Sequence, residues 1–342
     1  MKKYIHSPTR PFEVKLNSTT DDILKRMEGI SFQGRNLSYA LSVWKQMLKK
    51  DNVIFLGLAG AMVPAGMRKI ISFLIKNRYI DCLVSTGANL YHDLHETLGK
   101  YHWIGSASVD DCDLQKKGID RIYDTFALEK EFRQDDSFIM DFVKTLDLKR
   151  TYTTREFLYI LGKKLSVAGK TEGILTSAYK AKVPIFCPAL GDSSIGISMV
   201  WYLAKSGKSP VFDIIRDANE ISNIVAQAKS TGVIYVGGGT PKNYIQQAEV
   251  IATEFRRGRN IGHSYAIQIT ADAPHWGGLS GCTFNEAQSW GKISSKALKV
   301  NLYADATIVL PILITALHQN LGKSFKRKNL PDFNWKGKFV LI

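Results

Sequence analysis

The stretch Val53-Ile-Phe-Leu-Gly-Leu-Ala-Gly-Ala-Met-Val-Pro-Ala-Gly66 joins an apolar run to a loop of small residues. The length and β-branched content of the run are typical of a buried strand in a parallel sheet. Residues 65–76 follow, with apolar side chains at the spacing of one helix face. A strand, a small-residue loop and a helix in this order predict one repeating unit of an α/β fold.

Apolar runs of the same kind recur at 81–85, 183–187, 211–215, 232–236, 265–270 and 299–303. Helical patterns lie between them, and Thr153 with Glu156 has the spacing of a capping box at the start of one helix. This alternation predicts a doubly wound, mainly parallel sheet with helices on both faces. We expect an N-terminal helical extension at 1–50, one main domain at 51–322 and a basic surface tail at 323–342.

The chain has 342 residues, with 46 Lys and Arg against 31 Asp and Glu, so its formal net charge is +15. Basic residues are spread singly and in pairs, without a recognisable nucleic-acid motif, so we expect a basic surface and no nucleic-acid partner. The four cysteines are scattered, no secretory signal is visible, and no apolar run reaches the ~18 residues of a membrane span. These features predict a cytoplasmic protein without membrane contact.

Three loops of small residues follow predicted strands, at 57–66, 85–89 and 237–241. Small residues let backbone amides approach a phosphate, and the helix that follows adds partial positive charge at its N-terminus. No loop matches the G-x-G-x-x-G fingerprint, and a triple glycine is often only a tight turn. Three such loops in one sheet nevertheless favour a dinucleotide or another phosphate ligand.

Asp192 and Asp305 also follow predicted strands. Each could bind a ribose hydroxyl or a substrate ammonium, or could cap the next helix, and the sequence leaves both readings open. His92 and His95 stand three apart on a predicted helix, but no clear third ligand follows, so we predict no metal site. Lys292 follows an aromatic residue and a glycine, a setting that can favour the neutral amine that imine formation needs.

Seven stretches in a fixed order share one resemblance. They lie at 55–68, 83–89, 154–159, 188–192, 237–239, 286–292 and 303–306, and the Ser-Trp-Gly-Lys motif at 289–292 is the most specific. Together they resemble the deoxyhypusine synthase family, most closely its bacterial deoxyhypusine synthase-like branch. The resemblance implies a Rossmann-like homotetramer that binds NAD near subunit interfaces and builds each active site from two subunits.

In this family, NAD oxidises spermidine beside its secondary amine and 1,3-diaminopropane leaves. The four-carbon unit is held as an imine on the motif lysine until an acceptor amine displaces it, and NADH then reduces the product. The resemblance makes Lys292 that lysine, with Glu286 and Trp290 as substrate contacts and Asp192 in the same site. The expected cofactor-binding residues are Gly60, Ala61, Thr86, Gly87, Ala88, Gly238, Gly239, Ala304 and Asp305.

The departures from the family concern the substrate pocket. Ile197 stands where the family has a second aspartate, and Asn243 stands where it has a catalytic histidine. Tyr91 and His92 replace an acidic pair, and the acidic loop before the lysine motif is replaced by 273–280, leaving His275 as a candidate base. The expected substrate-binding residues of this altered pocket are Asn243, Gln247, Asp272, Ser280 and His92.

Each lost carboxylate leaves a substrate ammonium less well paired, which favours a different arrangement of amines. Our leading hypothesis is an NAD-dependent aminobutyl transferase that passes the unit to putrescine and gives homospermidine. The alternatives are a deoxyhypusine synthase acting on a lysine of the hypusine-bearing translation factor, and a non-catalytic relative that binds NAD or polyamines. Because polyamines are cations, we expect a basic outer surface around an acidic cavity lined by Asp192, Glu286 and Asp272.

Overall fold

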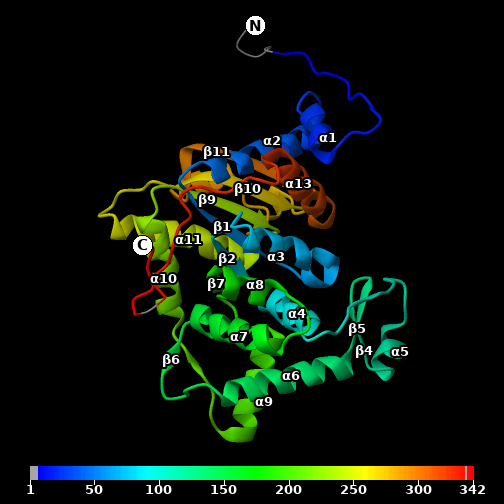
Figure 1. Cartoon of the computed structure of the whole chain (residues 1–342), viewed down its shortest axis with the longest axis vertical. Coiled ribbons are helices and arrows are strands. Elements are labelled where there is room, and N and C mark those ends of the chain that lie inside the picture. Colours follow the sequence, from blue (N-terminus) through cyan, green and yellow to red (C-terminus); the bar gives the residue numbers. More distant parts are fainter. Residues whose placement is uncertain (1–6, 336) are drawn as a thin grey trace.

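The computed structural model describes residues 7–335 and 337–342, which are built around one six-stranded parallel sheet (Figure 1). Its strand order is β11-β10-β9-β1-β2-β7, so in chain order the strands run 3-2-1-4-5-6 across the sheet. This is the Rossmann order, and it confirms the predicted doubly wound fold. The strands are β1 (Val53–Leu58), β2 (Cys82–Ser85), β7 (Ile185–Phe186), β9 (Thr231–Val236), β10 (His263–Thr270) and β11 (Ile293–Tyr303).

Successive residues of β1 enter two apolar cores, one on each face of the sheet. Ile54 and Leu56 belong to the first core, whereas Phe55 belongs to the second. The first core receives α1 (Thr20–Met27), α2 (Phe32–Lys49), α3 (Arg68–Lys76), α4 (Gly87–Thr97), α6 (Glu129–Lys144), α7 (Thr154–Ala168), α8 (Ile174–Ala181), α9 (Ser194–Ser206) and α13 (Ala306–Leu321). The second core receives α10 (Ile214–Gln227), α11 (Gly239–Phe255) and α12 (Phe284–Ser289).

The capping box predicted ahead of α7 is present. The hydroxyl of Thr153 accepts the N–H of Glu156, and the carboxylate of Glu156 accepts the N–H of Thr153. One predicted strand lies elsewhere than expected, because β8 (Val211–Phe212) pairs with β6 (Thr151–Tyr152) in a separate two-stranded sheet. A short apolar run does not by itself distinguish a central strand from a peripheral one.

The chain leaves the main body between α4 and α6 and forms a small antiparallel sheet (Figure 1). Residues 105–117 belong to this excursion and include a short helix. Its elements are β3 (Trp103–Ile104), α5 (Asp111–Lys116), β4 (Ile119–Ile122) and β5 (Thr125–Leu128).

The N-terminal extension is only partly separate from the domain. Residues 7–18 form no helix, whereas α2 contacts β10 and β11 and buries Trp44 and Met47 in the first core. The expected extension therefore contains the helices α1 and α2, and α2 is a structural layer of the Rossmann-like body. Among the described residues, no helix combines the length and apolar character needed to cross a bilayer.

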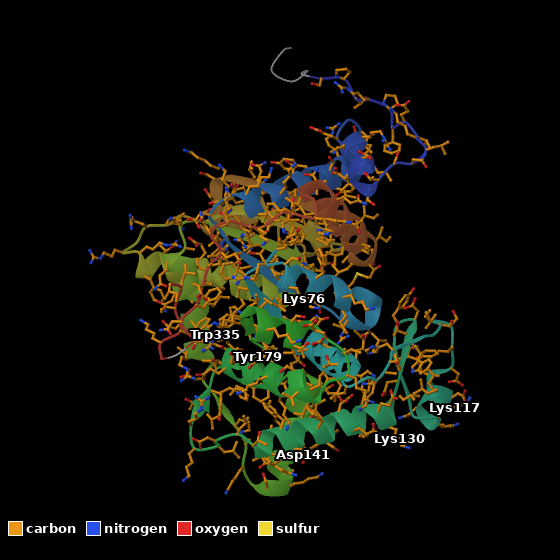
Figure 2. All side chains as sticks on the ribbon, in the orientation of Figure 1. Lys76, Lys117, Lys130, Asp141, Tyr179 and Trp335 are labelled. Atoms are coloured by element: carbon orange, nitrogen blue, oxygen red, sulfur yellow. The ribbon has the colours of Figure 1, made fainter. Side chains whose placement is uncertain are left out.

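The C-terminal segment, expected as a surface tail, instead packs on the protein. Arg327 is buried, and its guanidinium binds both carboxylate oxygens of Asp81 just before β2. Phe333 and Phe339 stack with ring centroids 5.6 Å apart in the second core. The labelled Trp335 lies on the same flank as Tyr179 (Figure 2). Basic composition suggested a solvated tail, but the segment's aromatic rings and one buried arginine fix it to the sheet.

Candidate active site

Helix α12 ends in a Schellman cap that presents Lys292. The N–H of Lys292 donates to the carbonyl of Ala287 at 3.1 Å, and that of Gly291 donates to Gln288 at 3.0 Å. Gly291 has φ +70°, and a Cβ there would overlap the side-chain amide of Asn260. The glycine of the motif is therefore required by backbone conformation and by space, and it turns the chain from α12 directly into β11.

Lys292, Glu286, Trp290 and Asn243 line one cavity of about 170 Å³ between α11 and α12. The Nζ atom of Lys292 lies 5.4 Å from the centroid of the Trp290 ring, within cation–π range. The Trp290 side chain is 68% exposed, so the cavity opens toward the surface. The structure thus brings together three candidate catalytic residues and one candidate substrate-binding residue.

The polar side chains of Lys242, Gln246 and Cys282 also line this cavity, and none of the three was among the residues expected from the sequence. Lys242 is 2% exposed, and burial lowers its pKa to about 8. Gln246 is buried, whereas the expected Gln247 is exposed on α11. Lys242 and Gln246 are four residues apart and share a helix face, which was the available signal once α11 was placed.

The predicted phosphate cradle at the triple glycine is partly filled by the chain itself. The N–H of Gly239 donates to the hydroxyl of Ser280 at 3.2 Å, and a Cβ at Gly238 would overlap Ser280. Because these glycines have no side chains, the loop at 277–282 can pack directly on the N-terminus of α11. Ser280 contacts this turn and does not line the Lys292 cavity.

The other predicted phosphate loops meet at the carboxyl edge of the sheet. β1 and β9 are neighbours at the point where the strand order reverses, which is where Rossmann-like sheets bind dinucleotides. Thr86 directly precedes α4, but its side chain does not cap the first turn of that helix. The hydroxyl of Thr86 instead donates to the carbonyl of Gly60 at 2.9 Å. Gly60 itself has φ +70°. The N-terminus of α4, with Gly87 and Ala88, therefore has the character of an anion-binding site.

The two aspartates that follow strands have different roles. Ser193 is the N-cap of α9, so the carboxylate of Asp192 is not used as a cap and is exposed. Asp305 is the N-cap of α13, with one oxygen accepting the N–H of Thr307 at 2.6 Å. This hydrogen-bonded Thr307 holds the pKa of Asp305 below its usual value. Ala304, the residue before this cap, is half-buried.

Asp192 is placed next to the expected cofactor loop by close packing. A Cβ at Gly87 would overlap the side chain of Ser193, so the start of α4 and the start of α9 touch at this glycine. Asp192 directly precedes Ser193 and lies outside the Lys292 cavity. Within one chain, Asp192 and the residues at the start of α4 therefore form a group separate from the Lys292 cavity.

His92 belongs to a chain of polar side chains behind α4. Its Nδ1 lies 2.9 Å from Nε2 of His102, and Nδ1 of His102 lies 2.9 Å from the carboxylate of Glu96. Burial lowers the pKa of His92 to about 3, and the charges of His102 and His95 act in the same direction. His92 is therefore a neutral side chain, and it does not line the Lys292 cavity. His95 bonds Asp135 at 2.6 Å instead of sharing a ligand with His92.

The charge of the cavity differs from the expected one. Its charged lining consists of Lys242, Lys292 and Glu286, so the Lys292 cavity of one chain is not acidic. Asp272 and His275 are exposed on the loop at 271–283 and are not part of the lining. Charge counting could not place these side chains because they lie on different elements.

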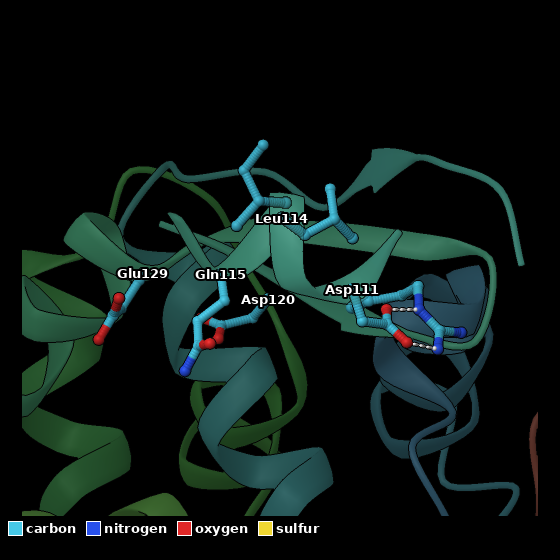
Figure 3. A pocket seen from close by; sticks show the side chains of 7 residues that line it. Asp111, Leu114, Gln115, Asp120 and Glu129 are labelled. Atoms are coloured by element: carbon cyan, nitrogen blue, oxygen red, sulfur yellow. Dashed lines mark hydrogen bonds and ion pairs between the residues drawn. The ribbon is translucent and has the colours of Figure 1, made fainter. Parts of the chain in front are cut away.

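A second hollow lies on the small antiparallel sheet (Figure 3). Its lining includes Asp111, Asp120 and Glu129, and the guanidinium of Arg121 binds both oxygens of Asp111 at 2.5 and 2.7 Å. None of the sequence-predicted site residues lies there. The Lys292 cavity therefore remains the candidate for catalysis.

The model of the deoxyhypusine synthase family matches residues 22–317. The chain belongs to the deoxyhypusine synthase family. "Probable deoxyhypusine synthase 2" of Methanosarcina acetivorans is 51% identical over 338 residues, covering 98% of this chain and 96% of the relative. "Probable deoxyhypusine synthase 1" of the same organism is 38% identical over 318 residues, covering 93% and 96%.

A bacterial relative supports the expected likeness to deoxyhypusine synthase-like proteins. "Deoxyhypusine synthase-like protein" of Chlorobaculum tepidum is 35% identical over 321 residues, covering 92% of this chain and 87% of the relative. The structure titled "Crystal Structure of a putative deoxyhypusine synthase from Entamoeba histolytica" matches with a TM-score of 0.64 and 16% identity. It covers 93% of this chain and 99% of the other, and it supports the fold.

Membership of the deoxyhypusine synthase family makes this chain a transferase of aminobutyl groups. In that family setting, the cavity between α11 and α12 contains the motif lysine together with Glu286 and Trp290. The other group, around Thr86 and Asp192, lies at the carboxyl edge of the sheet.

Proposed function

We propose that this member of the deoxyhypusine synthase family is an NAD-dependent transferase that moves the four-carbon amine unit of spermidine onto Lys292 and then onto putrescine, giving homospermidine. The observation that supports this most strongly is that Lys292, Glu286 and Trp290 share one cavity of about 170 Å³. A linear aliphatic amine fits the combination of an apolar ring, a carboxylate and an amine nucleophile.

Lys292 attacks as the neutral amine. Its nitrogen forms a bond to the oxidised carbon of spermidine, the bond from that carbon to the secondary nitrogen breaks, and 1,3-diaminopropane leaves with that electron pair and a proton. Attack by the acceptor amine on the lysine imine reverses the exchange and frees Lys292. Glu286 stabilises the positive charge on the amine, and Trp290 offers a cation–π face and a wall for the butyl chain.

The residues at the carboxyl edge fit a dinucleotide. The uncapped first turn of α4, with Thr86, Gly87 and Ala88, would hold the pyrophosphate, and the loop with Gly60 and Ala61 leaves room beside it. When bound there, NAD would accept a hydride from the donor carbon and return it to the final imine. This chain's own residues bind and orient both molecules. We also assign the following cofactor contacts to this edge: Gly238, Gly239, Ala304 and Asp305.

The neutral side chains at positions where this chain departs from the family, one inside the Lys292 cavity and two outside it, support a free diamine as acceptor. His92 is uncharged at neutral pH because burial lowers its pKa to about 3, and Ile197 is 47% exposed without any charge to offer. Asn243 lines the cavity as a neutral side chain. Fewer charges to pair with the amines indicate substrates arranged differently from those of an enzyme rich in carboxylates.

Deoxyhypusine synthesis on a lysine of the hypusine-bearing translation factor is the second candidate function. The name of the 51% identical relative, "Probable deoxyhypusine synthase 2", favours it. Methanosarcina acetivorans, the organism of that relative, has a second family member that is less similar to this chain. Two members in one organism support a division of acceptors between them, which is the reason that the free diamine stays our first candidate.

We further propose that the active site is completed by a second copy within a homotetramer. In one chain, Asp192 is exposed and outside the Lys292 cavity, and Trp290 is largely exposed. The nearby helix α9 also exposes Ile197, Val200 and Leu203. An apolar helix face beside an unpaired carboxylate has the character of a subunit interface. Sedimentation of the purified chain tests this, because a monomer would contradict it.

Product analysis tests the function. The protein is incubated with spermidine, putrescine and NAD, and the amines are separated by chromatography; homospermidine is expected and its absence contradicts the first candidate. Replacing putrescine with the hypusine-bearing factor tests the second candidate through labelled aminobutyl transfer. Borohydride added to the protein with NAD and spermidine labelled in its four-carbon unit should leave a four-carbon adduct on Lys292 that is lost in Lys292→Arg. Absence of the adduct in the unaltered protein contradicts both enzymatic candidates.

A further inference from the structure

A buried lysine that has no part in the proposed chemistry lies beside Lys292. The ammonium of Lys242 donates three hydrogen bonds, to Oε1 of Gln268 at 2.9 Å and to the carbonyls of Leu279 at 3.1 Å and Cys282 at 2.6 Å. Three donors meet three acceptors, so the charged form is fully satisfied. This lysine is therefore occupied by the protein and is not a second imine-forming residue.

Gln268 extends the same arrangement from strand β10. Its side chain is 1% exposed, and its Nε2 donates to the carbonyl of Gly237 at 3.0 Å and to that of Ser280 at 2.8 Å. Lys242 and Gln268 thus bind four backbone carbonyls, three in the loop at 277–282 and one at the start of the glycine turn. Without these donors the carbonyls would need other partners, and a buried polar group without one is costly.

The loop held in this way forms part of the wall around Lys292. Gly277, Gly278 and Leu279 line the cavity, and α12 with Glu286 begins just after the loop. We propose that Lys242, together with Gln268, is a positioning residue that holds the loop at 277–282 in the arrangement that forms the amine-binding cavity, and that loss of the Lys242 proton releases this loop. This positioning role of Lys242 and Gln268 depends on the proposed function in one respect only, which is the identity of the amine that the cavity binds.

The chemistry of a lysine gives the release its direction. A neutral amine has two N–H groups, so at least one of the three acceptors loses its donor when the proton leaves. Burial is the main cause that lowers the pKa of Lys242 to about 8; Cys282 and Glu286 act against this shift, and the positive charge of Lys292 acts in the same direction as burial. Gln268, the partner from β10, is uncharged. The loop should therefore be held at pH 7 and loosen between pH 7.5 and 9.

Hydrogen exchange of the backbone amides at 277–282, followed by mass spectrometry, tests the proposal without substrate. In Lys242→Met we expect these amides to exchange at least tenfold faster at pH 7, with unchanged exchange in α13. In the unaltered protein, we expect the loop to lose protection from exchange between pH 7.5 and 9, after correction for the intrinsic effect of pH on exchange. Lys242→Met should show no such loss of protection over this pH range. Lys296→Met, which removes an exposed lysine, is the matched control.

Two further results keep the test decisive. If Lys242→Met does not fold, Gln268→Leu should give the faster loop exchange, because it removes the partner amide while retaining the lysine. Unchanged loop exchange in whichever variant folds, or protection that does not vary with pH in the unaltered protein, overturns the proposal. For the adduct on Lys292, Lys242→Met should raise the spermidine concentration needed for half-maximal trapping about tenfold. If the protein makes no homospermidine but its loop shows the expected hydrogen exchange, only the proposed acceptor is contradicted.

Discussion

Arg327 binds Asp81, 246 positions earlier in the chain, through contacts of 2.8 and 2.7 Å between its Nη1 and the two carboxylate oxygens. Both side chains are buried. We expect Arg327→Ala to lower the free energy of unfolding by about 3–5 kcal/mol, because it leaves a buried carboxylate without its main partner. Urea unfolding measures this. Lys328→Ala, at the exposed neighbouring position, should change stability by less than about 0.5 kcal/mol, and an equal loss in both variants would contradict the assignment.

Gly291→Ala should impair the presentation of Lys292. An alanine at φ +70° costs about 1–2 kcal/mol, and its Cβ would also displace Asn260. We expect slower trapping of the spermidine adduct on Lys292. Gly258→Ala is the matched control, because Gly258 also has positive φ, at +79°, but has open space around its Cβ position. The control should lose stability without losing adduct formation.

Trp290→Leu keeps an apolar wall but removes the aromatic face near Lys292. A cation–π contact at an exposed site contributes about 0.5–1 kcal/mol, so KM for spermidine should rise about two- to fivefold. Initial rates across a spermidine series measure this. Trp103→Leu alters another exposed tryptophan, on β3, and should leave KM unchanged. An unchanged KM in Trp290→Leu would remove the ring from the substrate contacts.

His92 should make the protein less stable in mild acid. Its folded pKa is about 3, against 6.5 for an unperturbed histidine, so below about pH 6.5 the unfolded chain binds a proton that the folded chain does not. The contribution of His92 is therefore complete above pH 6.5 and declines as the pH falls toward 3. We expect the Tm of His92→Asn to fall less than that of the unaltered protein between pH 7 and 5. Parallel Tm curves would contradict this pKa.

The order of elements could be predicted from local patterns because each strand of the Rossmann-like sheet is a short apolar run with its own turn signals. Strand β1 lies at the residues quoted for it, and the capping box at Thr153 is present. The role of β8 could not be predicted, because its run resembles a central strand and its pairing partner β6 is two residues long. Arg327 was also missed, since pairing across such a separation leaves no local signal.

Positions within the site could be predicted where the residues are close together in the sequence, within a single motif. The glycine of the Ser-Trp-Gly-Lys motif occupies the positive-φ position of the cap, and Trp290 and Lys292 lie beside one another. Lys242 was missed because a lysine in sequence gives no sign of burial. The alternatives at Asp192 and Asp305 were separated only by structure, since capping depends on which residue comes first in the helix.

The contact between Gly87 and Ser193 links two distant positions of the chain. Any side chain larger than hydrogen at position 87 would require position 193 to shrink or its loop to move. These two positions should therefore change together during divergence, so that a relative with alanine at the first would have glycine at the second. Such paired substitution would also reposition the neighbouring Asp192 without any change to the lysine motif.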